Sequence, residues 1–140
     1  MAYGSTAGVA ALSALWTDGT SGLFTTTTRP TLAQVTTWLD QVSKLLDTAL
    51  NDQGFDTPVT VTAVTGELGL LVEGIVKDLC DYSHGAGRFF TEKALDAGIN
   101  PFMTVDKELH EWVKRKVVGL EKQGLIRSSQ GRNVASLEVF

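Results

Sequence analysis

The 140-residue sequence has one cysteine, three prolines and no long apolar run. Its single cysteine, Cys80, excludes a disulfide bond within the chain and fits a reducing compartment. No stretch reaches the ~18 apolar residues that a membrane-spanning helix needs. Residues 1–16 contain no Lys or Arg, so a signal peptide is not expected. The sequence therefore predicts a protein without membrane segments or an internal disulfide.

Charge is distributed unevenly along the chain. Residues 1–102 carry five Lys or Arg against eleven Asp or Glu, and residues 103–140 carry seven against five. The net charge is thus −6 in the first part and +2 in the second. An acidic partner is therefore expected at the last third of the chain. The 43% hydrophobic content is typical of one globular domain rather than of a disordered chain.

Amphipathic helical patterns dominate the sequence. The predicted helices span 5–16, 30–53, 58–82 and 105–123, with a shorter helix at 89–98. We therefore expect an all-α fold, a small bundle of about four main helices. Residues 1–125 form the expected helical domain, with an extended N-terminal arm at 17–29. Residues 126–140 have no helical period and are expected to form a non-helical C-terminal tail for partner contact.

The second helix has clear signals at both ends. The β-branched run Thr25–Thr28 favours an extended path before it. Pro30 and Thr31 both suit the start of this helix. Pro30 suits the first helical position because its missing N–H would have no partner there, and Thr31 suits the N-cap. Gly54 suits a left-handed stop, and Phe55 can fold back over the last turn.

The third helix contains Gly66, Gly69 and Gly74, each of which costs up to ~1 kcal/mol relative to alanine. Close packing of this helix against another backbone is the interpretation that we favour over a break near Gly66. In the last helix, Thr104 is the predicted cap. Gly124 is the predicted C-terminal stop, with Leu125 placed to touch Leu120.

No pattern in the sequence indicates catalysis, a cofactor or a metal. His84 and His110 lack metal-ligand spacing, and Cys80 lies in an apolar stripe, where a small core residue is expected. Glu111 and Arg115 are spaced for an ion pair on a solvated helix face. Trp38 lies at the edge of a stripe and suits either the core or a subunit contact.

The stretch "LWTDGTSGLFTTTTRPTLAQVTTWLDQVSKLLDTALNDQGFDTPV", residues 15–59, resembles the N-terminal half of head–tail adaptor (connector) proteins of tailed bacteriophages. In that family an "F…T.P" arm leads into "PT..QV..WID.A...LD.AL...G...PV". The matching residues are Phe24, Thr28, Pro30, Thr31, Gln34, Val35, Leu39, Asp40, Leu46, Asp47, Ala49, Leu50, Gly54, Pro58 and Val59. The second long helix, alanine-rich in that family, is rich in glycine and valine here.

The resemblance implies a structural virion protein at the neck, assembled in the host cytoplasm. Such proteins form a ring, expected to be dodecameric, beneath the portal protein; it extends the DNA channel and docks the next neck or tail-completion protein. Double-stranded DNA then passes through the ring without sequence-specific binding. The expected portal or partner contacts are Arg127, Arg132, Val134, Leu137, Val139 and Phe140, in a tail whose apolar alternation suits strand addition to a neighbour. The expected subunit interface contains Trp38, Thr25 and Arg29.

A winged-helix DNA-binding regulator is the alternative. Residues 104–123 then form the recognition helix, and residues 125–140 form a wing with a basic tip at Gly131 and Arg132. The acidic residues in the first turns of this helix argue against it, because base-contacting side chains belong there.

Overall fold

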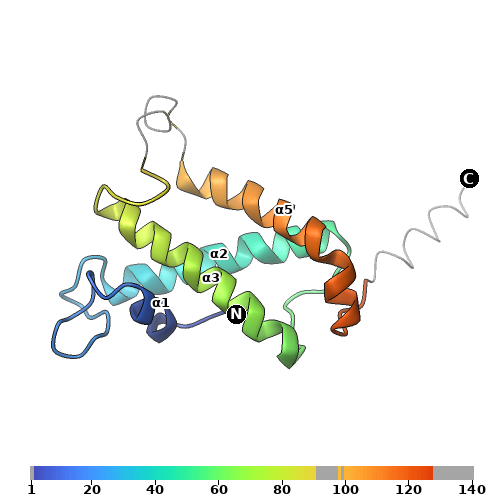
Figure 1. Cartoon of the computed structure of the whole chain (residues 1–140), viewed down its shortest axis with the longest axis horizontal. Coiled ribbons are helices and arrows are strands. Elements are labelled where there is room, and N and C mark those ends of the chain that lie inside the picture. Colours follow the sequence, from blue (N-terminus) through green and yellow to red (C-terminus); the bar gives the residue numbers. More distant parts are fainter. Residues whose placement is uncertain (1, 91–97, 99, 128–140) are drawn as a thin grey trace, which may run out of the picture.

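The computed structural model describes residues 2–90, 98 and 100–127. These residues form four helices, namely α1 (Thr6–Leu12), α2 (Leu32–Asp52), α3 (Thr62–Ser83) and α5 (Pro101–Lys122). Helix α2 is central and packs against both α3 and α5, while α1 packs mainly on α3 (Figure 1). The predicted all-α fold is therefore confirmed for the described residues. None of these helices is both long and apolar enough to cross a membrane.

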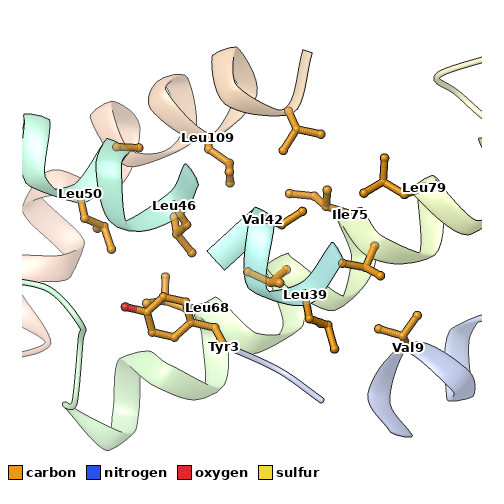
Figure 2. Close-up of a cluster of buried hydrophobic side chains, with 14 of the residues drawn as sticks. Tyr3, Val9, Leu39, Val42, Leu46, Leu50, Leu68, Ile75, Leu79 and Leu109 are labelled. Carbon is orange, nitrogen blue, oxygen red and sulfur yellow. The ribbon is translucent and has the colours of Figure 1, made fainter. Parts of the chain in front are cut away.

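The core lies where α2 meets its neighbours. Figure 2 shows α2 presenting Leu39, Val42, Leu46 and Leu50 toward Leu68, Ile75 and Leu79 of α3 and Leu109 of α5. All eight side chains are buried. Burial of each large aliphatic side chain contributes about 1.5–3 kcal/mol before the entropy of ordering is subtracted. The apolar faces of the three long helices therefore meet around α2, and the buried face of α3 is centred near Val72.

Both ends of α2 follow the predicted chemistry. The Thr31 side chain accepts a hydrogen bond from the backbone N–H of Gln34 at 3.2 Å, so Thr31 is the cap and Pro30 lies outside the helix. At the other end Gly54 has a φ of 87°, and the N–H of Phe55 donates to the carbonyl of Leu50 at 3.0 Å. The prediction that Phe55 folds back is confirmed, because its side chain is buried.

The threonine run before α2 avoids helix, as expected, but it turns instead of extending. The N–H of Thr25 donates to Oγ1 of Thr28 at 2.9 Å, and the carbonyl of Thr25 accepts from the N–H of Leu32 at 2.9 Å. Phe24, next to the run, is buried. Threonine hydroxyls near their own backbone favour such turns. The segment 17–29 is therefore a turned loop held by the buried Phe24 rather than an extended arm.

Close backbone packing holds at one of the three α3 glycines. A Cβ added at Gly69 would lie 3.2 Å from the backbone nitrogen of Gly4, where the N-terminal segment crosses α3. At Gly66 and Gly74 an added Cβ meets no atom within 4 Å among the described residues. The prediction of close packing is therefore confirmed at Gly69 and wrong at the other two positions.

Helix α5 begins earlier than predicted. The Asn100 side chain accepts from the N–H of Phe102 at 2.9 Å, and Pro101 occupies the first turn, so Thr104 is not the cap. The predicted C-terminal stop is confirmed, because Gly124 has a φ of 106° and the N–H of Leu125 donates to the carbonyl of Leu120 at 3.1 Å. The predicted short helix at 89–98 falls largely outside the described residues.

Candidate interaction surfaces

Cys80 is a core residue. Its side chain is buried on α3 and lies outside the reach of solvent. Burial, reinforced by the negative charge of Asp81, raises the pKa of the Cys80 thiol to about 12. Because the thiolate is the reactive form of cysteine, this thiol is chemically inert at neutral pH.

His84 belongs to a cluster that fastens the loop before α2 to the end of α3. Its ring stacks on Trp16 with centroids 3.7 Å apart and an interplanar angle of 7°. Its Nε2 lies 2.6 Å from the carbonyl oxygen of Arg29. Nε1 of Trp16 in turn donates to Asp81 at 2.8 Å, and Nζ of Lys77 donates to the same carboxylate at 2.6 Å. The contacts of His84 therefore hold the loop in place.

His110 links the C-terminal end of α2 to α5. Its Nδ1 lies 3.2 Å from Asp52, and its Nε2 lies 3.3 Å from Asp106. Among the described residues, no group of three or more His, Cys, Asp or Glu side chains is arranged to hold a metal ion. The position of His110 is that of a cross-link between two helices.

Of the three expected subunit-interface residues, Thr25 and Arg29 lie in the loop before α2, and Trp38 lies in its second turn. Trp38 is half-buried and packs against the core, in agreement with the core alternative. Thr25 is half-buried in its turn, whereas the Arg29 side chain is exposed and donates to the carbonyl of Thr28 at 3.1 Å. Of the three, Arg29 is thus the side chain most accessible to a second molecule.

Arg127 is the one expected partner-contact residue that the structure describes. Its Nε donates to the carbonyl of Gln53 at 2.7 Å, and its guanidinium lies 5.8 Å from the centre of the Phe55 ring. Phe55 and Arg127 also form an isolated antiparallel bridge. Arg127 is therefore engaged by its own domain. The other expected contacts, Arg132, Val134, Leu137, Val139 and Phe140, lie outside the described residues.

A groove of about 650 Å³ lies between α3 and α5, on a side of the domain to which α2 contributes no lining residue. Its lining is Leu12 of α1, Leu70, Leu71, Gly74, Ile75, Lys77 and Asp78 of α3, Arg88, and Glu108, Leu109, Glu111, Trp112 and Arg115 of α5. Leu70 is 72% exposed and Leu12 is 51% exposed. The groove thus presents large aliphatic side chains to solvent, which is typical of a surface that another segment covers.

The rim of this groove carries both paired and unpaired charges. Arg88 bridges Asp78, at 2.7 Å, and Glu108, so these three charges compensate one another. Glu111 and Arg115 take part in none of the ion pairs of the described residues, so the pairing that their spacing predicts is not formed. One acidic and one basic side chain therefore stand at the groove without an ionic partner in the described part of the chain.

Sequence reasoning did not identify the groove. The first helix was predicted to run to residue 16, but α1 ends at Leu12, and Leu15 beyond it is 85% exposed. The sequence did contain one indication of an apolar surface here, because Leu70 is an apolar residue that lies outside the helix face formed by Leu68 and Ile75. Comparison of this chain with protein-family models, with curated proteins and with solved structures found no match.

Proposed function

We propose that this protein is a structural virion component, a head–tail adaptor that forms a ring beneath the portal of a tailed bacteriophage. The ring extends the DNA channel and docks the next neck or tail-completion protein. Each copy acts through its surfaces and carries out no reaction. Assembly takes place in the host cytoplasm, and the product resides at the neck of the virion.

One observation carries this proposal: within the resembling segment, the residues that cap and end the long helix occupy the structural roles that their order in the sequence calls for. Phe24 and Val59 are buried at the two ends of the resembling segment. Thr31 caps the long helix, and Gly54 ends it in the left-handed conformation. An ordered set of cap, stripe and stop is more specific than any one of its elements, and this order is what supports the proposal.

The distribution of charge and apolar surface also supports a ring. Head-to-tail contacts between copies need two different surfaces on each copy, and they close into a ring when the rotation permits. The groove with Leu12 and Leu70 is one such surface, and the exposed region around Arg29 is the other that we assign. The net charge of −6 over residues 1–102 suits a channel, because Lys and Arg provide the contacts that retain DNA.

The winged-helix alternative receives less support from α5. Asp106 and Glu108 lie in its first turns, where they face His110 and Arg88. A recognition helix places base-contacting donors in those turns. Acidic side chains held by partners of their own domain do not suit that task.

The test is assembly with the portal protein encoded in the same genome. We expect sizing and negative-stain images of the mixture to show a ring of this chain on the portal. Arg29→Glu should weaken that association, whereas the control Lys44→Glu, at an exposed position on α2, should not. A chain that stays monomeric and never joins the portal contradicts the proposal.

A further inference from the structure

The outer side of α5 carries a cluster of cations without ionic partners. Of the ten Lys and Arg residues that the structure describes, six form no ion pair with another described residue. Four of these six lie on α5, and all four side chains are exposed; they are Lys107, Lys114, Arg115 and Lys122. At 3.6 residues per turn they fall within an arc of about 100°, over a length of roughly 22 Å. These four residues are named the basic face of α5.

The rest of the domain does not neutralise this face. Residues 2–90 carry four Lys or Arg against nine Asp or Glu, but none of these acids forms an ion pair with the basic face. The flanking acids Glu108 and Glu121 are already held in ion pairs of the domain. Glu111 is the one acid within the arc. The basic face is therefore a surface of net positive charge on an otherwise acidic domain.

The centre of the basic face is apolar. Val118 lies one helical turn from both Lys114 and Lys122, within the same arc, and is 65% exposed. Protein interfaces commonly have an apolar centre that a polar rim surrounds. An exposed valine between unpaired cations is the same arrangement on a small scale.

We propose that the basic face of α5 docks an acidic helix of another protein. Carboxylates of that helix lie opposite the four cations, and an apolar side chain lies opposite Val118. The acidic partner that the sequence places at the last third of the chain is thereby assigned to one face of one helix.

An acidic protein fits this face better than a nucleic acid does. Duplex DNA carries one negative charge per about 1.7 Å of its axis, so phosphates laid along α5 meet Glu111 as well as the cations. A protein helix has carboxylates at discrete positions and can place a neutral side chain opposite Glu111. A phosphate backbone also has no apolar group to cover Val118.

Docking of this kind depends on salt. Complementary charges mainly raise the rate and the specificity of association, and salt screens exposed charges within about 10 Å at 0.1 M ionic strength. The inference does not rest on the proposed function. Under that proposal, the acidic partner is a protein that meets the ring, because neighbouring copies are assigned to the groove and to the region around Arg29.

Fluorescence anisotropy with the full-length protein tests the docking. The probe is a labelled synthetic helical peptide in which glutamates flank a row of leucines. Its control is the same peptide with glutamine in place of every glutamate, and a labelled DNA duplex is the second probe. Each titration is carried out at low and at moderate salt.

Two double variants separate the basic face from net charge. Lys114→Glu with Lys122→Glu reverses two cations of the face. Lys44→Glu with Lys116→Glu changes the net charge by the same amount at exposed positions outside the face. Far-UV circular dichroism verifies the fold of both. Glu111→Gln removes the one acid of the face and should strengthen binding, a result that a folding defect cannot imitate.

We expect the acidic peptide to bind at low salt and the reversal of Lys114 and Lys122 to weaken it about tenfold, whereas the matched variant weakens it less than about twofold. Glu111→Gln should tighten binding by about twofold. No binding of the acidic peptide, equal binding of the glutamine peptide, or equal losses in the two double variants overturns the inference. Tighter binding of the duplex than of the peptide also overturns it, because the partner is then a nucleic acid. No portal is present, so failure of the peptide test leaves ring assembly to be judged by its own experiment.

Discussion

Nε of Arg127 donates to the carbonyl oxygen of Gln53 at 2.7 Å, which joins the chain just after α5 to the residue just after α2. The guanidinium also lies 3.3 Å from Glu121 and above the ring of Phe55. These contacts extend the folded domain to Arg127, two residues beyond the boundary at 125 that the sequence predicts. Arg127 therefore belongs to the folded domain rather than to the tail that the sequence predicts.

Truncation tests this boundary. Removal of residues 128–140 should leave the helical circular dichroism signal nearly unchanged. Arg127→Ala should instead lower the free energy of unfolding by about 1 kcal/mol, because a hydrogen bond from a charged donor is lost. Urea denaturation measures both effects. Arg115→Ala is the control, since that exposed side chain makes no ion pair in the described residues. A large loss of helix on removal of 128–140 would place that segment in the core instead.

The start of α5 gives a second prediction. Asn100→Ala removes the side chain that accepts the hydrogen bond of Phe102, and it should lower the free energy of unfolding by about 1 kcal/mol. Thr104→Ala should have a much smaller effect, because Thr104 lies inside the helix. Thermal or urea unfolding of the two variants decides between them. The reverse order of effects would restore Thr104 as the cap.

Two glycines of α3 should respond to alanine in opposite directions. Gly66 has open space around it among the described residues, so Gly66→Ala should raise the free energy of unfolding by up to about 1 kcal/mol through helix propensity. Gly69→Ala places a methyl group 3.2 Å from the backbone nitrogen of Gly4. Gly4 has little room to move, because its neighbours Tyr3 and Ser5 donate from their backbone N–H groups to Ser43 and Glu73. We therefore expect Gly69→Ala to destabilise the protein.

If Gly66→Ala and Gly69→Ala raise the free energy of unfolding by the same amount, the close contact at Gly69 is contradicted. Chemical denaturation in urea with unchanged m-values makes the comparison direct, since an altered m-value would signal a change in the unfolded state rather than in the contact.

Asp81 gives the fold a pH-dependent contribution. Burial opposes ionisation, but hydrogen bonds from Lys77 and Trp16 outweigh it and hold the pKa of this carboxyl below its ordinary value of 3.8. A depressed pKa means that the carboxylate stabilises the folded state above the ordinary value and that this contribution is lost as the pH falls through the folded pKa. Asp81→Asn should therefore cost about 1 kcal/mol at neutral pH and progressively less in acid.

The measurement is the difference in unfolding free energy between the wild type and Asp81→Asn at several pH values. Asp40→Asn, at an exposed position of α2, is the control for the substitution itself. A difference for Asp81→Asn that stays constant from neutral pH into acid would show that the ionised form of this carboxyl is not what stabilises the cluster.

The sequence predicts most of the helical architecture, because caps and stripes act locally. Thr31, Gly54 and Gly124 stand where their backbone chemistry requires. The turn at Thr25 and the cap at Asn100 were missed, since several residues compete for each role and tertiary contacts select one. The groove was missed for a different reason: its residues are far apart in the sequence, and exposure at Leu70 depends on where α5 lies.

The central claim is that this chain is completed by copies of itself on a portal. Cryo-electron microscopy of the purified chain mixed with the portal protein of the same genome tests that claim most directly. The account predicts a closed ring of this chain coaxial with the portal, with the channel lined mainly by residues of the acidic part of the chain. A complex in which single copies bind duplex DNA through α5 while the portal remains bare would contradict it.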